Sequence, residues 1–261
     1  MVKEKIQILV AAHKESLLPK DSMYLPIQVG ASLSENKFSG YQGDNQGQNI
    51  SLKNPYFNEL TAIYWARYNS SADVIGLVHY RRYFSLKKNK NLEDILNVKQ
   101  LSELLDNVDV ILPKKRHYWI ESSESHYRHA HHGSSLDAVR QVITNKYPDY
   151  VEVFEKQMSK TSSHMFNMFI MRRKEFNDYS DWLFDILFEV EKLIHSEVLS
   201  WNTYEKRVYG FLSERLLDVW IVKNNIQYKE IPVNFMEKQN WLLKGGKFLA
   251  RKVGFGRMDG K

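Results

Sequence analysis

The chain has 261 residues, of which 43% are hydrophobic and 13% aromatic, and it contains no cysteine. This composition fits one globular domain with a sizeable core and excludes disordered and fibrous proteins, while the lack of cysteine excludes disulfides, cysteine–zinc sites and thiol catalysis. No run approaches the ~20 apolar residues of a membrane span, and the N-terminal segment lacks the pattern of a signal peptide. We therefore expect a cytoplasmic enzyme.

The net charge of +6 is unevenly distributed along the chain. Residues 238–261 carry seven basic residues and one acidic residue, so residues 1–237 are neutral overall, which argues against a nucleic-acid partner. This tail mixes its cations with Trp241, Leu242 and Phe248, as do basic amphipathic segments that bind anionic membrane surfaces. A solvated, frayed terminus is the alternative, because Gly245, Gly246, Gly254 and Gly256 weaken a helix there. We predict one domain followed by this tail.

The first predicted elements alternate between apolar runs and polar segments. Ile6–Ala12 is a short, nearly continuous apolar run, which predicts a buried parallel strand. Residues 14–53 are irregular, and a loop that long in a compact domain is usually functional. Asn54 and Pro55 predict a helix start, with Asn54 as N-cap. Val74–Val78 predicts a second buried strand, which leads directly into the sequence HYRRYF.

The second half of the chain continues this alternation. Val108–Pro113 predicts a third strand, followed by a basic turn and a polar, histidine-rich loop. Further strands are expected at His164–Met171 and Gln227–Val233. Apolar residues at helical spacing predict helices at Leu136–Asn145, 182–194 and 208–219. The pattern indicates an α/β fold with a mostly parallel sheet, in which ligands bind beyond the carboxyl ends of the strands.

Three polar segments follow predicted strands and should meet at one crevice: His13-Lys14, residues 79–84 and Lys114–Arg116. In residues 79–84 two adjacent arginines stand among aromatic residues. Guanidinium groups bind phosphate bidentately, and aromatic rings can contact a base or sugar. A surface turn with an arginine stacked on a tyrosine is the alternative. The chain has no Asp-x-Asp pair, P-loop or GxGxxG, so we expect cationic side chains to neutralise a bound diphosphate, with no cofactor or metal required.

Four histidines gather in the polar loop: His126, His129, His131 and His132. They could form a metal site, contact an acceptor sugar, or belong to an ordinary surface loop. Metal ligands need fixed geometry and supporting carboxylates, which a polar loop does not guarantee.

Three carboxylates are candidates for chemistry. Glu59 and Glu214 lie in predicted helices, and either could be the general base that accepts a proton from an acceptor hydroxyl. Glu214 is flanked by Arg207 and Arg215, so a structural salt bridge is the alternative. Asp44 lies in the long loop, where it could contact a ribose or sugar hydroxyl or form an ordinary Asp-Asn turn.

Five segments occur in the following order: VAAHK, GDNQGQNISLKNPYFNELTAIYWARYN, IGLVHYRRYF, HMFNMFIMRRKEFNDYSDWLFDIL and RVYGFLSERLLDVWI. Together they resemble a bacterial glycosyltransferase family from capsular and exopolysaccharide gene clusters, formerly a domain of unknown function. The match covers about residues 5–235, and HYRRYF after the ELTAIYW helix is its most specific part. The resemblance implies a GT-A-like (Rossmann-like) fold and transfer of a hexose, with galactopyranose or galactofuranose suspected, from a UDP-sugar to a lipid-linked acceptor.

The resemblance also implies roles for particular residues. Those on the donor side are His13, Lys14, Asp44, Asn45, His79, Arg81 and Arg82. To the acceptor side we assign His126, His129, His164 and Asn167, with Glu214 as the base. Asn58 and Arg67 depart from the family pattern, and neither is expected to contact the reacting groups. The competing hypothesis is a non-catalytic glycan- or nucleotide-binding module, which would not need converging arginines and a base. A sugar-phosphate hydrolase is disfavoured by the missing metal carboxylates.

Overall fold

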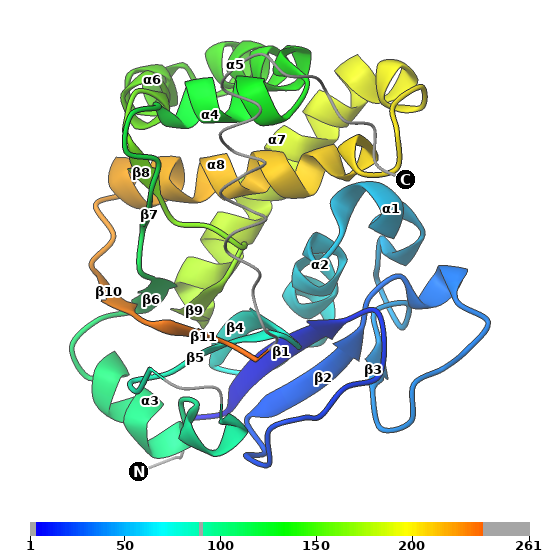
Figure 1. Cartoon of the computed structure of the whole chain (residues 1–261), viewed down its shortest axis with the longest axis vertical. Coiled ribbons are helices and arrows are strands. Elements are labelled where there is room, and N and C mark those ends of the chain that lie inside the picture. Colours follow the sequence, from blue (N-terminus) through cyan, green and yellow to red (C-terminus); the bar gives the residue numbers. More distant parts are fainter. Residues whose placement is uncertain (1–3, 89–90, 237–261) are drawn as a thin grey trace.

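The protein is described by a computed structural model that places residues 4–88 and 91–236 (Figure 1). The strands of its central sheet are β1 (Ile6–Ala12), β2 (Tyr24–Gln28), β3 (Gln42–Gly43), β4 (Val74–His79), β5 (Arg82–Phe84), β6 (Val110–Pro113), β9 (Phe169–Arg172), β10 (Tyr228–Ile231) and β11 (Val233–Phe235). Seven of them lie in the order β10-β6-β9-β4-β1-β2-β3, while β5 pairs with both β4 and β11. A separate ribbon pairs β7 (Arg116–His117) with β8 (Ser162–Ser163).

Helices cover both faces of the sheet. They are α1 (Asn54–Phe57), α2 (Leu60–Asn69), α3 (Val98–Leu105), α4 (Ser123–Ala130), α5 (Gly133–Lys146), α6 (Val151–Met158), α7 (Arg173–Val198) and α8 (Val208–Lys223). Figure 1 shows α4 to α8 gathered beyond one face, with α3 on the other side. Short 3₁₀ turns lie at Ala31–Leu33, Ser51–Lys53, Leu92–Asp94, Pro148–Tyr150 and Glu205–Arg207.

Alternate side chains of β1 enter two different cores. Leu9 and Ala11 pack in the larger core with residues of α2, α5, α7 and α8. Ile8 and Val10 pack in the smaller core, with α3 and β5. Because successive side chains of a strand point to opposite faces, a strand covered on both sides is apolar along its buried part, which in β1 is Ile8–Ala12. This is why Ile8–Ala12 shows no alternation of apolar and polar residues.

The predicted α/β fold with a mostly parallel sheet is confirmed. Strand β1 pairs in parallel with β2 and β4, and β6 pairs in parallel with β10. Strand β9 runs antiparallel to both β4 and β6. Its direction had no signature in the sequence, because a fully buried strand is apolar whichever way it runs.

Several predicted boundaries need correction. Residues 14–53 are not irregular throughout, since they contain β2 and β3 at one edge of the sheet. The helix expected from Asn54 is broken at Asn58, which has a positive φ of 50° and separates α1 from α2. Asn54 itself is the first residue of α1 and follows Lys53 at the cap position. The strand expected from His164 begins later, at Phe169.

Two further expectations concern the histidine-rich segment and the tail. The predicted loop of histidines is largely helix α4. The basic tail, residues 238–261, lies outside the described residues. Across residues 4–88 and 91–236, no helix is both long enough and apolar enough to span a bilayer.

Candidate active site

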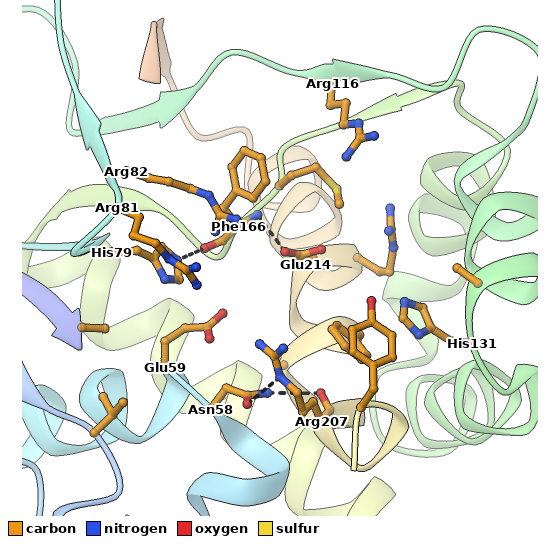
Figure 2. Close-up of a pocket in the computed structure, with 18 of the residues that line it drawn as sticks. Asn58, Glu59, His79, Arg81, Arg82, Arg116, His131, Phe166, Arg207 and Glu214 are labelled. Carbon is orange, nitrogen blue, oxygen red and sulfur yellow. Dashed lines mark hydrogen bonds between the residues drawn. The ribbon is translucent and has the colours of Figure 1, made fainter. Parts of the chain in front are cut away.

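A cavity of about 1020 Å³ lies at the edge of the sheet where its parallel strands end (Figure 2). Strand β9 runs antiparallel to both β4 and β6, and β1 is parallel to β4, so β1, β4 and β6 all end at this edge. The cavity therefore brings together most of the predicted crevice: His13, His79, Arg81, Arg82 and Arg116. Its opposite wall is formed by α4 and α8.

The adjacent arginines of the β4–β5 turn lie on aromatic rings. The guanidinium of Arg81 lies 4.9 Å from the ring centre of Tyr80, and that of Arg82 lies 4.4 Å from that of Phe166. Arg82 Nε is buried and has no hydrogen-bond acceptor among residues 4–88 and 91–236. Burial lowers the pKa of Arg82, and the charge of Arg81 adds to this effect. Two neighbouring cations, one with an unused donor, make this wall of the cavity favourable for an anion.

The backbone of Phe166 connects two residues of the cavity wall (Figure 2). His79 Nε2 donates a hydrogen bond to the Phe166 carbonyl over 2.6 Å, and the Phe166 N–H donates to Glu214 Oε1 over 2.8 Å. Phe166 and Asn167 have positive φ angles of 78° and 52°, a backbone conformation that is costly for phenylalanine. Burial lowers the pKa of His79, which keeps its ring neutral at pH 7. The two hydrogen bonds hold this strained turn in place.

Glu214 lies in α8, half-buried at the cavity wall. It forms no ion pair with Arg207 or Arg215 in the described part of the chain, and its hydrogen bond is instead with the backbone of Phe166. The alternative that Glu214 forms a structural salt bridge with either arginine is therefore wrong. Burial raises the pKa of Glu214, and the negative charge of Glu59 raises it further, although Arg215 opposes the shift. A carboxyl group whose pKa is raised toward neutrality is suited to proton transfer.

Glu59 immediately precedes α2 and lines the same cavity. Asn167 Nδ2 donates to Glu59 Oε1 over 2.7 Å and to the Gly210 carbonyl over 3.0 Å, while Ser213 Oγ donates to Asn167 Oδ1 over 2.8 Å. Asn167 is 3% exposed and does not line the cavity. Its predicted acceptor contact is therefore corrected: Asn167 orients Glu59.

Asn58 and Arg207 form a contact that the sequence did not predict. Arg207 Nε donates to Asn58 Oδ1 over 2.9 Å, and Asn58 Nδ2 donates to the Arg207 carbonyl over 3.4 Å (Figure 2). Gly210 makes room for it, because a Cβ there would lie 2.7 Å from Asn58 Nδ2. Asn58 lines the cavity, and the expectation that it does not contact the reacting groups stays a prediction. Arg67 is indeed outside the cavity and forms an ion pair with Asp181.

Two of the clustered histidines line the cavity and pair with carboxylates. His129 Nδ1 lies 2.7 Å from Glu121 Oε1, and His131 Nδ1 lies 3.1 Å from Glu205 Oε2. An Nδ1–H held by a carboxylate leaves Nε2 as the free ring nitrogen of a neutral histidine. The predicted contact of His129 with an acceptor is thus compatible with its position and stays a prediction.

The other two clustered histidines stack on aromatic rings. His126 lines the cavity and stacks on Tyr118 at 4.3 Å, whereas His132 stacks on Trp201 at 4.1 Å and is not part of the lining. The described residues contain no group of three histidine, aspartate or glutamate side chains that could hold a metal ion. The predicted contact of His126 with an acceptor is compatible with its place in the lining and stays a prediction.

Asp44 is fully buried, and its carboxylate holds the surrounding loop by hydrogen bonds. Its carboxylate accepts hydrogen bonds from the N–H groups of Gly30 and Ala31, over 2.8 and 2.9 Å, and from Thr61 Oγ1 over 2.6 Å. Ser51 Oγ donates to it as well. These bonds occupy both carboxylate oxygens, so the predicted contact with a sugar hydroxyl is corrected. Asp44 fixes the segment that follows β2.

Three other predicted site residues lie outside the cavity lining: Lys14, Asn45 and His164. Lys14 and Asn45 are exposed. The side chain of His164 is fully buried between Asp218 and Glu230, with its Nδ1 2.5 Å from Asp218 Oδ1 and its Nε2 3.2 Å from Glu230 Oε1. His164 therefore belongs to a polar network behind the cavity, which corrects its assignment as an acceptor contact.

Arg207 and Phe211 line the cavity but were not assigned from the sequence. A local signal for them exists. Residues 207, 210, 211 and 214 recur at spacings of three and four, which places them on one face of a helix. The candidate base Glu214 marks that face as the one turned toward the cavity.

The fold and the cavity together define an α/β protein with a glycosyltransferase fold and a polar site at its strand ends. Residues 7–225 match the family described as "Domain of unknown function (DUF4422)", and the chain belongs to this family. Among solved structures, it is similar to the apo structure of WbbM, a bifunctional glycosyltransferase, with 30% sequence identity and a TM-score of 0.83. The match covers 90% of this chain and 46% of the WbbM chain, so this chain corresponds to less than half of that protein. No curated protein matches the chain.

Proposed function

We propose that this chain is a hexosyltransferase that transfers galactose, in its pyranose or furanose form, from a UDP-sugar to a growing glycan. The observation that carries the proposal is the meeting of the adjacent Arg81 and Arg82 with two carboxylates, Glu59 and Glu214, in one cavity. The similarity to WbbM supports transferase chemistry in general. The family resemblance supports a lipid-linked acceptor in capsular or exopolysaccharide synthesis.

The donor binds at the β4–β5 turn in this proposal. Arg81 and Arg82 bind the diphosphate and stabilise the negative charge that develops on it as the glycosidic bond breaks. No divalent cation is required, because the two guanidinium groups supply the positive charge. The rings of His13 and Tyr80 pack edge-on with their centres 5.2 Å apart, next to Arg81, and form the surface for the nucleoside.

The two carboxylates act on the sugar and on the acceptor. Glu59, oriented by Asn167, binds hydroxyl groups of the donor sugar. Glu214 faces the acceptor from the α8 wall. In an inverting transfer it takes the proton of the acceptor hydroxyl, and in a retaining transfer the same carboxylate stabilises the positive charge that develops on the sugar.

The test is release of UDP from UDP-galactose without an acceptor, measured in EDTA and compared with UDP-glucose and GDP-mannose. Slow UDP release by the wild type in EDTA, lost in Arg82→Ala and kept in Arg67→Ala, is the expected result. Arg67 is a matched control because it is an arginine in an ion pair outside the cavity. Binding of UDP-galactose without any release, even after addition of acceptor extract, would support a non-catalytic module. Loss of activity in EDTA with rescue by manganese would contradict the metal-independent mechanism.

A further inference from the structure

A second group of positive charges lies at the other end of the cavity. Arg215, in α8, lines the cavity and is 3% exposed. Its Nη1 donates to the hydroxyl groups of Tyr118, Ser123 and Ser163. Its Nε is buried and finds no acceptor within residues 4–88 and 91–236.

The charge of Arg215 is not neutralised by a direct ion pair with any described carboxylate. Its sequence neighbour Glu214 turns to the backbone of Phe166, and Glu121, which also lines the cavity, pairs with His129. Burying a charge is costly unless a counter-charge accompanies it, and hydroxyl groups satisfy donors without supplying one. A buried guanidinium with an unused donor at a cavity wall is therefore suited to a ligand anion.

Arg116 supplies a second cation at the same end. It lies in β7 opposite Ser163 of β8, and Ser163 is one of the hydroxyl groups that bind Arg215. Its side chain is exposed, lines the cavity, and forms no hydrogen bond or ion pair with any described residue. Figure 2 shows Arg116 on a strand apart from the turn that carries Arg81 and Arg82, and Glu214 lines the same cavity. Arg116 and the turn with Arg81 and Arg82 thus form two positively charged parts of the cavity.

We propose that Arg116 and Arg215 form an anion subsite for the acceptor, so that the acceptor carries a negatively charged group close to the hydroxyl that receives the hexose. The group is either the carboxylate of an acidic sugar or a phosphate of a lipid-linked diphosphate, which present the same anionic oxygens. This inference rests on the proposed function, in which Arg81 and Arg82 already match the one diphosphate of the donor. A bidentate contact with guanidinium suits both sources.

The test is calorimetric titration of the full chain, first with UDP and then, at saturating UDP, with four probes. They are methyl glucuronide with its neutral match methyl glucoside, and farnesyl diphosphate with its neutral match farnesol. The variants are Arg116→Ala and Lys114→Ala. Lys114 is a matched control, because it is an exposed cation two residues away that does not line the cavity.

One charged probe is expected to bind the wild type about tenfold or more tightly than its neutral match. This is the difference in affinity that one charged hydrogen bond provides. Arg116→Ala should remove most of this difference, Lys114→Ala should keep it, and both should bind UDP like the wild type. The charged probe that binds identifies the source of the anion. Because Arg116 is exposed, its replacement should leave the fold intact, which a change at the buried Arg215 would not ensure.

Equal binding of charged and neutral probes, or an unchanged preference in Arg116→Ala, overturns the anion subsite. A loss of UDP affinity in Arg116→Ala overturns it too, since Arg116 would then belong to the donor site. Failure of the wild type to bind UDP contradicts the proposed function instead. The probe titrations without UDP then still report whether Arg116 binds an anion.

Discussion

Asn167 and Glu59 are 108 residues apart in the chain, and they meet through a hydrogen bond of 2.7 Å from the amide Nδ2 to the carboxylate Oε1. Asn167 also accepts from Ser213 and donates to the Gly210 carbonyl, so its amide is fixed from three sides. An amide held in this way presents one donor to Glu59 in one direction. The orientation of the Glu59 carboxylate therefore depends on a residue that does not itself line the cavity.

We expect Asn167→Asp to lower kcat by about 10- to 100-fold, since a misplaced catalytic group commonly costs this much. The substitution replaces the donor with a second carboxylate against Glu59, whereas the left-handed backbone conformation remains accessible to aspartate. The affinity for UDP should stay within about twofold of the wild type. Ser213→Ala is the matched control, because it removes a contact of Asn167 and leaves the bond to Glu59. Equal losses of kcat in the two variants would mean that packing, and not Glu59 orientation, is affected.

Arg81→Ala and Arg82→Ala should each weaken UDP binding by about 1.5–3 kcal/mol, roughly 10- to 150-fold. Each change removes charge-assisted hydrogen bonds to the diphosphate. Uridine, which has no phosphate, should bind the variants and the wild type equally well. Calorimetry with UDP and uridine measures both effects. Unchanged UDP affinity in both variants would place the diphosphate elsewhere in the cavity.

Glu214→Gln is expected to abolish turnover and to raise thermal stability at pH 7. The pKa of Glu214 is raised in the folded protein by burial, so the native state binds this proton more tightly than the unfolded chain does. Stability from this group is therefore present at low pH and is lost as the pH rises through the raised pKa. Glutamine removes the buried charge, and its side-chain oxygen can still accept a hydrogen bond from the Phe166 N–H. A gain of ~1 kcal/mol would raise the Tm by about 2–4 °C.

The measurement is the Tm of both proteins between pH 4 and pH 8. The advantage of Glu214→Gln should grow as the pH rises and disappear at the acidic end. A variant that is less stable than the wild type at pH 7 would indicate that the carboxylate is held by a favourable ion pair after all.

The tail from Lys238 is expected to bring the enzyme to anionic membranes. Each basic residue near such a surface contributes about 1 kcal/mol, and the apolar residues of the tail would add interfacial insertion. Binding should weaken with salt, because the attraction is screened within roughly 8 Å at physiological ionic strength. Sedimentation with phosphatidylserine vesicles should be lost on truncation before Lys238, with UDP affinity unchanged. A full-length chain that ignores these vesicles at low salt would leave the tail as a packing or oligomer contact.

The sequence by itself determined the class of fold and the edge of the sheet at which the site forms. Buried strands are recognisable as apolar runs, and the residues that follow them must lie at their carboxyl ends. The sequence therefore predicts that His13, His79, Arg81, Arg82 and Arg116 lie close together, and all five line one cavity. Both features, the apolar run and the polar residue that follows it, can be read locally, because a strand and the next residue are adjacent in the chain.

Only the tertiary structure decided which polar side chains face the cavity and which serve the scaffold. Asp44 and His164 are as polar as Glu214, yet each is buried with hydrogen-bond partners from distant segments. Thr61 donates to Asp44, and Asp218 bonds to His164. Such partners lie far away in the chain and leave no periodic trace in it. The pattern of apolar residues predicts burial of a strand or a helix face, whereas the role of a buried polar group depends on the donors and acceptors that distant segments bring to it.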